Sequence, residues 1–398
     1  MENEISRLIG NEPLSLLVER VLERAMAIQS IPAPTFDEKL RGEFVQKCFA
    51  DEGLAEVAKD EAGNVYARIP GADQSVRPVV VSAHLDTVFS LDADLSLRRQ
   101  GDKLYGPGIG DNSLGLAGLF GLLWALRLRG QAGEAAIRLP GDVWLVATIG
   151  EEGLGDLRGM RLVVDRFGAA PLAYLVLEGT TIGNIYNQGL AIQRYRLAVH
   201  TPGGHSWKDY GSPSAIHELA ALVTRLAALP LPVQPRTTLN VGMIAGGTSV
   251  NTIASQAHLE LDLRSEGEAA LDDLVRRVKE LAFSAARPDV QVELELIGQR
   301  PAGHIPASHA LVCTARRCLA AQGLEANIMS GSTDANIPLS RGLPAICLGL
   351  STGEGAHTLN EYIDIPPLRR GLSVLACLVE AIFQDLESGG SHRRNRTR

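Results

Sequence analysis

The stretch Val79-Val80-Val81-Ser82-Ala83-His84-Leu85-Asp86 decides the fold class, because an apolar run ends here in a histidine and an aspartate. Three similar apolar runs occur at residues 143–148, 173–177 and 344–348. Strands that are apolar throughout, rather than alternating, are typical of sheets covered on both faces. Between the first two runs, residues 115–128 have the pattern of a buried helix. We therefore predict an α/β domain with a mixed, mostly parallel sheet flanked by helices.

The middle of the chain has a different pattern. Residues 193–199, 258–264 and 290–296 tend to alternate polar and apolar side chains, which predicts strands with one wet face. Helical periodicity occurs between them, at about 214–228 and 267–285. We predict an α+β module at 189–298, inserted into an α/β domain formed by 1–188 and 299–385. The basic segment 386–398 is expected to be a disordered tail.

Length and charge narrow the class of protein. A chain of 398 residues suggests two domains, and its net charge of −8 gives no reason to expect nucleic acid or an anionic membrane as a partner. The longest apolar run, residues 114–126, is shorter than the roughly 18 residues typical of a membrane span. The N-terminus lacks the features of a signal peptide, and the 5 cysteines include no Cys-x-x-Cys. We expect a cytoplasmic protein with reduced thiols.

Acidic and histidine residues follow the apolar runs. His84 and Asp86 lie two residues apart at the end of a strand, so both point to the same face. The carboxyl edge of such a sheet is where α/β proteins bind ligands. A carboxylate beside an imidazole can accept its second N–H and strengthen the other nitrogen as a metal ligand. The alternative is a core histidine beside a helix-capping aspartate.

Further candidates follow in the same arrangement. Asp111 ends the glycine-rich turn 105–112, where it is either a ligand or an N-cap. Glu151 and Glu152 follow the strand at 143–148, and adjacent buried carboxylates are costly unless cations compensate them. Consecutive side chains should point apart, so one glutamate can bind metal while the other acts as a base. The alternative is a solvated loop. Glu178 and His357 follow the strands at 173–177 and 344–348, and either could be an ordinary loop residue.

The conjunction of these residues is more informative than any one of them. Each of four apolar strands is followed by an acid or a histidine, which capping or chance explains poorly. Two histidines and three carboxylates suit two borderline metals such as zinc, with one carboxylate bridging. Two ions a few Å apart can polarise a carbonyl and lower the pKa of a water. The candidate ligands are His84, Asp111, Glu152, Glu178 and His357.

The order of these motifs resembles the family that contains carboxypeptidase G, acetylornithine deacetylase and succinyl-diaminopimelate desuccinylase. These are di-zinc exopeptidases and amidohydrolases, and the resemblance spans about residues 30–380. It implies that His84, Asp111 and Glu178 hold one metal, and that Asp111, Glu152 and His357 hold the other. It also implies that Asp86 orients His84. Glu151 would be the general base that passes a proton to the leaving amine.

The resemblance also assigns the inserted module. In the family this module is a lid that makes the dimer, and Gly203-Gly204-His205-Ser206 resembles its histidine motif. His205 is then expected to reach the partner subunit's site and stabilise the oxyanion. Asn251 and Arg264 resemble substrate-binding positions, and an arginine suits a substrate carboxylate. Gly331, in the turn 330–334, resembles a loop residue that approaches the substrate.

The sequence departs from the family where the substrate would lie. Many relatives have Asp-x-Lys-Gly-Gly after the bridging aspartate, but this chain has Asp111-Asn112-Ser113-Leu114-Gly115, which leaves the substrate open. We predict a homodimeric hydrolase with two divalent ions per subunit, zinc with cobalt or manganese possible. It would cleave a peptide or N-acyl amide next to a free carboxylate, as a carboxypeptidase or deacetylase does.

Two other functions stay open. The first is a peptidase T-like aminopeptidase, although relatives of that type often have Asp where this chain has Glu178. The second is a non-catalytic metal-binding scaffold. Such proteins usually lose a ligand or the base, whereas all five ligands and Glu151 are present here.

Overall fold

The structure, a computed structural model, describes residues 11–131 and 139–394. It divides into two compact units, a discontinuous unit (Met1–Gln188, Gly303–Arg398) and an inserted unit (Gly189–Ala302). The second boundary lies four residues beyond the position predicted from the sequence. The reason is that β14 (Gln291–Arg300) continues past residue 298 and pairs with its neighbour as far as Arg300.

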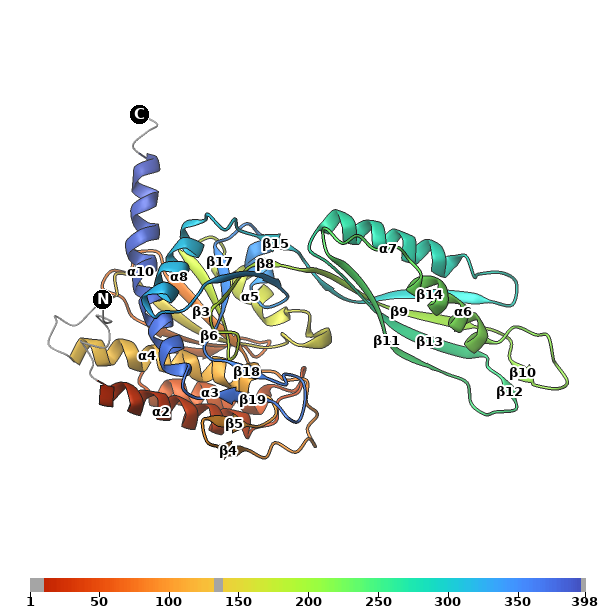
Figure 1. The fold of residues 1–398 in the computed structure, drawn as a ribbon, viewed down its shortest axis with the longest axis horizontal. Helices are drawn as coiled ribbons and strands as arrows, with labels where there is room; N and C mark the ends of the chain where they lie inside the picture. The colour runs from red at the N-terminus through yellow and green to blue at the C-terminus, as the bar shows by residue number, and fades with distance from the viewer. Residues whose placement is uncertain (1–10, 132–138, 395–398) are drawn as a thin grey trace. The chain divides into compact units, whose positions relative to one another are not determined.

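The core of the discontinuous unit is a 9-stranded sheet (Figure 1). Its centre consists of four strands in the order β6-β3-β7-β17, and these neighbours are parallel. They are β3 (Val79–His84), β6 (Val143–Thr148), β7 (Ala173–Glu178) and β17 (Ala345–Gly349). Antiparallel strands flank them, with β2 (Val65–Ile69) next to β6 and β8 (Asn184–Gly189) next to β17. The predicted α/β class with a mixed sheet is confirmed. The outer strands are β1 (Ala55–Lys59), β15 (Gly303–His304) and β16 (Asn327–Gly331).

Helices cover this sheet, and every residue of β3 and β6 is buried. The central helix α4 (Gly115–Gln131) contacts β3, β6 and β7, and it packs against α2 (Asn11–Gln29) and α10 (Leu368–Arg394). The stretch Ile109–Leu128 is long and apolar enough to cross a membrane, but 89% of its most apolar window is buried inside the protein, as expected for a core helix. The other helices are α3 (Lys39–Asp51), α5 (Arg158–Phe167), α8 (Ala310–Ala321) and α9 (Asn336–Ser340).

The C-terminal segment differs from the expectation. We predicted a disordered tail from residue 386, but α10 continues to Arg394. The remainder of that segment, 395–398, lies outside the described residues.

A small antiparallel sheet connects distant parts of the chain. Its order is β18-β19-β5-β4, formed by β18 (Gly353–Glu354), β19 (Tyr362–Asp364), β5 (Lys103–Tyr105) and β4 (Arg98–Gln100). Pairing of Tyr362 with Tyr105 places the β18–β19 hairpin beside the glycine-rich turn that follows β5. The connection between β18 and β19 contains His357, and the glycine-rich turn leads to Asp111.

The inserted unit has its own core. Its antiparallel sheet has the order β11-β13-β9-β14, and α6 (Ala215–Ala227) and α7 (Glu268–Phe283) pack on β9 and β13 (Figure 1). Buried and less buried residues alternate along β13 (Gln256–Ser265), which is the one-sided pattern predicted from the sequence. The other strands are β9 (Ala191–His200) and β11 (Thr237–Gly246), with a separate ribbon of β10 (Gly204–His205) and β12 (Thr252–Ile253).

Candidate metal centre

Histidine and acidic side chains gather at one edge of the discontinuous unit's sheet. His84 and Glu178 are the last residues of β3 and β7, and Glu152 follows β6 in the next turn. Because these strands are parallel, their carboxyl ends lie at the same edge. Asp111 approaches from the turn before α4, and His357 from the β18–β19 connection. The five candidate ligands therefore come from separate segments, all within one unit.

Asp111 lies between two histidine clusters. Its Oδ1 is 3.0 Å from Nε2 of His84, whose Nε2 is also 3.7 Å from Oε2 of Glu178. Its Oδ2 is 3.0 Å from Nε2 of His357, which is 3.1 Å from Oε1 of Glu152. In each cluster the three ligand atoms lie within 4.8 Å of one another. Each oxygen of Asp111 thus faces a different cluster, which is the arrangement of a bridging carboxylate.

A close approach of two glycines makes this arrangement possible. Gly179 follows Glu178 directly, and a Cβ at this position would lie 2.1 Å from the carbonyl oxygen of Gly110. A residue with a side chain would therefore push the loop of Asp111 away from the end of β7.

Burial and crowding perturb the pKa values of these groups. Burial, aided by the nearby carboxylates of Asp111 and Glu152, raises the pKa of Glu178 to about 7, although hydrogen bonding to His84 opposes this. Hydrogen bonds to Asp111 and Glu152 raise the pKa of His357 to about 10. Burial alone would lower the pKa of His84, but its hydrogen bonds to Asp111, Asp86 and Glu178 outweigh burial and raise it well above its usual value.

The donor set fits divalent cations. In the part of the chain that the structure describes, the ion pairs of Asp111, Glu152 and Glu178 are all with the two histidines. Three carboxylates therefore share two imidazoles, which must stay protonated to balance the negative charge. Cations placed between them would compensate the carboxylates and leave the imidazoles neutral, as metal ligands must be.

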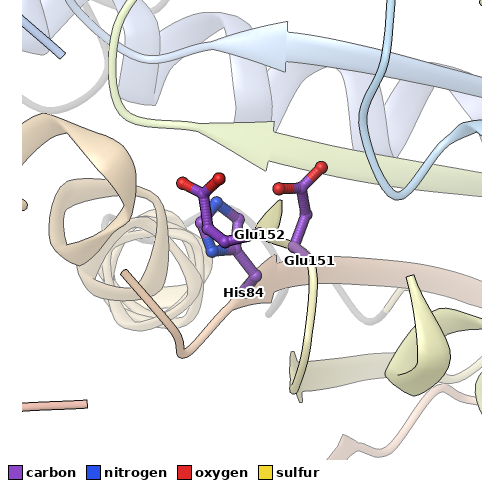
Figure 2. A group of neighbouring side chains, drawn as sticks. All are labelled: His84, Glu151 and Glu152. Atoms are coloured by element: carbon purple, nitrogen blue, oxygen red, sulfur yellow. The ribbon is translucent and has the colours of Figure 1, made fainter. Parts of the chain in front are cut away.

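Glu151 lies closer to Glu152 than expected. We predicted that the two consecutive side chains would point apart. Figure 2 shows instead that both carboxylates extend from the main chain in the same direction, as does the ring of His84. One ligand atom from each of His84, Glu151 and Glu152 lies within 4.8 Å of the others. Both glutamates are buried, each 6% exposed. This third grouping means that geometry alone permits Glu151 as either a ligand or a base.

Asp86 contacts His84 and also the Glu151–Glu152 turn. Nδ1 of His84 is 3.0 Å from the main-chain oxygen of Asp86 and 3.5 Å from its carboxylate. A carbonyl oxygen can only accept, so Nδ1 carries the proton and Nε2 faces the acids. The fully buried carboxylate accepts the main-chain N–H groups of Glu151 (3.0 Å) and Glu152 (2.9 Å). It also accepts the hydroxyl of Thr35 at 2.9 Å.

Glu361 is a buried site residue that was not predicted from the sequence. This glutamate is 1% exposed, and it accepts main-chain N–H groups from Gly108, Gly110 and Asp111. Burial raises the pKa of its carboxyl to about 7, against the effect of these hydrogen bonds. The only sequence signal was its position four residues after His357, which does not indicate a partner some 250 residues away.

Gly331 and the other residues predicted to bind substrate lie in different units. Gly331 ends β16 in the discontinuous unit, and a Cβ there would lie 2.7 Å from the ring of Tyr186. In the inserted unit, β10 and β12 place His205 beside Asn251, whose carbonyl accepts the N–H of Ser206 at 3.0 Å. His205 is exposed, and its Nδ1 accepts the N–H of Trp207.

Arg264 lies elsewhere in the inserted unit. It pairs with Ile192 near the end of β13, whereas the β10–β12 ribbon precedes the start of that strand. At about 3.3 Å per residue, the length of β13 separates the two. The guanidinium of Arg264 donates to both oxygens of Asp262, at 2.5 and 3.2 Å.

Comparison with known proteins settles the family. Residues 80–381 match the profile of peptidase family M20/M25/M40, which covers more than half of the chain. The chain belongs to this family. Carboxypeptidase G2 from Pseudomonas sp. is 25% identical over 382 residues, spanning 91% of this chain and 88% of that protein. An uncharacterised protein, YqjE of Bacillus subtilis, is 24% identical over 378 residues, spanning 91% and 98%.

A solved structure shares the fold. A tripeptidase from Staphylococcus aureus superimposes with a TM-score of 0.77 at 22% identity, covering 92% of this chain and 99% of that one. Membership of the M20 family confirms the resemblance noted in the sequence, and it makes the protein a hydrolase of the metallopeptidase and amidohydrolase type. Family membership by itself assigns no role to an individual residue.

Proposed function

We propose that this M20 protein hydrolyses a peptide or N-acyl amide bond next to a free carboxylate, using two divalent ions, which we propose to be zinc. The observation that carries the proposal is Asp111, whose two oxygens face two separate clusters. His84, Asp111 and Glu178 would hold one ion, and Asp111, Glu152 and His357 the other. When bound, such a pair supplies Lewis acidity that polarises a carbonyl and acidifies a water.

Glu151 has the properties needed in a general base. Its main-chain N–H donates to Asp86 at 3.0 Å, and one of its carboxylate oxygens lies within 4.8 Å of a ligand atom of His84, from one cluster, and of Glu152, from the other. The five other residues already supply a donor set for each ion, which leaves Glu151 to take a proton from the attacking water. The same carboxyl would then return that proton to the leaving amine. Asp86 orients His84 through its main-chain oxygen and fixes the turn through its carboxylate.

The inserted unit would supply substrate contacts. We propose that it acts as a lid and makes a homodimer, with His205 of one subunit stabilising the oxyanion in its partner's site. Asn251, which adjoins His205, would bind substrate at the same place. Arg264 would bind the substrate carboxylate, and for this it must exchange its present bond to Asp262 for one to the substrate. Gly331 would let the β16 loop approach the substrate closely. Nothing in this scheme requires a nucleic acid or a membrane, and we place the enzyme in the cytoplasm.

A peptidase T-like aminopeptidase is the second candidate, because the same metal chemistry serves both. The two candidates differ in the end of the substrate that is recognised. A panel of dipeptides, tripeptides and N-acyl amino acids, each free or blocked at either end, separates them after reconstitution with zinc. We expect C-terminal amidation to lower kcat/KM by about tenfold or more, since a hydrogen-bonded charge pair is lost.

The outcomes of this panel are distinct. Loss of activity on blocking the amino group, with amidation tolerated, would favour the aminopeptidase and contradict carboxylate recognition by Arg264. Absence of hydrolysis across the panel, in protein that binds two ions per chain, would favour a non-catalytic metal-binding scaffold.

A further inference from the structure

Glu361 is a buried carboxylate outside the proposed ligand set, and it lies at the junction of two ligand-bearing segments. It follows His357 in the connection that leads into β19, and its partners lie in the turn between β5 and α4. The side chain is 1% exposed. An isolated carboxylate at this depth would be costly, so its retention depends on the donors that surround it.

Three main-chain donors satisfy this carboxylate. One oxygen, Oε2, accepts the N–H of Gly108 at 2.6 Å. The other, Oε1, accepts the N–H of Gly110 at 2.8 Å and that of Asp111 at 2.7 Å. Hydrogen bonds to an ionised acceptor are short and about twice as strong as those between neutral groups. The carboxylate therefore fixes the turn at three points within four residues.

The third of these donors is the N–H of the proposed bridging residue itself. A fixed main chain at Asp111 also fixes the point from which its side chain extends. The two oxygens of that side chain lie 3.0 Å from His84 and 3.0 Å from His357. The main chain of Glu361 also contributes, because its carbonyl accepts the N–H of Gly106 at 2.9 Å. The segment that carries His357 is thereby joined to the segment that carries Asp111.

We infer that Glu361 is a positioning residue for the metal centre, which holds Asp111 in the orientation that bridges two divalent ions. This inference rests on the proposed two-metal function. Glu361 itself contacts neither ion nor substrate; it acts through the main chain of Asp111. Removing its charge should therefore weaken the binding of both ions, because both clusters share Asp111.

The test is the metal affinity of Glu361→Gln. An amide has a single acceptor oxygen, and its NH2 group would face at least one main-chain N–H. We expect zinc affinity to fall by roughly 10- to 100-fold, the usual effect of losing a group that orients a ligand. Affinity is measured by competition with a chromophoric chelator, alongside thermal melting of the metal-free protein. Glu354→Gln is the matched control, because it makes the same change at an exposed residue of the same hairpin.

The outcomes separate this inference from the proposed function. Two bound ions in the wild type, with affinity in Glu361→Gln within twofold of it, would overturn the inference and leave the function standing. A wild type that binds no zinc overturns both. A lower melting temperature with unchanged affinity shows a merely structural role and also overturns the inference. If Glu361→Gln does not fold, Glu361→Asp serves instead, since it keeps the charge but is one methylene too short to reach all three donors.

Discussion

Asp86 and Glu361 hold two different loops of the candidate site in the same way. Asp86 accepts the N–H groups of Glu151 and Glu152, and Glu361 accepts those of Gly108, Gly110 and Asp111. Each carboxylate follows a proposed histidine ligand, His84 or His357, in its own segment. Each also accepts hydrogen bonds from the main chain of a loop that carries a proposed acidic ligand. The site is thus built as two halves, in which a buried carboxylate joins a histidine segment to an acidic loop.

The two halves differ in what their loops carry. The loop held by Asp86 carries the proposed base beside a proposed ligand of one ion, whereas the loop held by Glu361 carries Asp111, the ligand proposed to be shared by both ions. Substitutions in the Asp86 half should therefore affect turnover and the binding of one ion. Substitutions in the Glu361 half should affect the binding of both ions. This difference can be tested one residue at a time.

The largest effect is expected for Glu151→Gln in the Asp86 half. The amide is nearly isosteric but cannot take a proton, so kcat should fall by about 10²- to 10⁴-fold. Zinc content, measured by mass spectrometry on the same sample, should remain at two ions per chain. A variant that loses an ion would instead assign Glu151 to the ligand set, as the third grouping with His84 and Glu152 permits.

A change of pH should affect both halves at once. In the metal-free protein the pKa of His357 is about 10 and that of His84 lies well above its usual value, so both rings are protonated at neutral pH. Metal binding requires neutral rings, and raising the pH removes the competing protons. Zinc affinity should therefore rise between pH 6 and 8, by about tenfold per pH unit for each proton displaced.

Proton release can be measured directly by calorimetry in buffers of different ionisation enthalpy. Release of at least one proton for each ion bound agrees with the charge balance described above. Binding of both ions without proton release would contradict it.

A smaller and more selective effect is expected for Asp86→Asn. The variant weakens the acceptor for the N–H groups of Glu151 and Glu152, while the main-chain oxygen that orients His84 is unchanged. We expect the ion held by Glu152 and His357 to bind roughly 10- to 100-fold more weakly. The ion held by His84 should be affected less, because His84 keeps its main-chain partner and loses only the charge 3.5 Å from its Nδ1. A zinc titration should show two separated steps, in contrast to Glu361→Gln. An equal loss of affinity for both ions would contradict the distinction between the two halves.

Features set by local sequence periodicity could be predicted from the sequence. Asp86 was found because it lies two residues from His84 on one strand, where alternation places both side chains on one face. The central strands β3, β6, β7 and β17 were found because unbroken apolar runs indicate strands covered on both faces. The local periodicity of the sequence therefore indicates both where the buried strands lie and which side chains share a face at their ends.

Glu361 could not be found in this way. Its partners are set by the pairing of β19 with β5, two strands of three residues each that have no distinctive pattern. The proximity of the Glu151 and Glu152 carboxylates was also missed, because a tight turn does not follow the alternation of a strand. Asn251 lies beside the β10–β12 ribbon, whereas Arg264 lies near the far end of β13. Their separation depends on how the strands pair, and the distance between the two residues along the sequence does not reveal that pairing.

The most direct test of the two-metal centre is anomalous diffraction at the zinc edge from crystals of the reconstituted protein. We expect two peaks per chain with Asp111 between them, one beside His84 and Glu178 and the other beside Glu152 and His357. A single peak, or a peak bound by Glu151 together with His84 and Glu152, would contradict it.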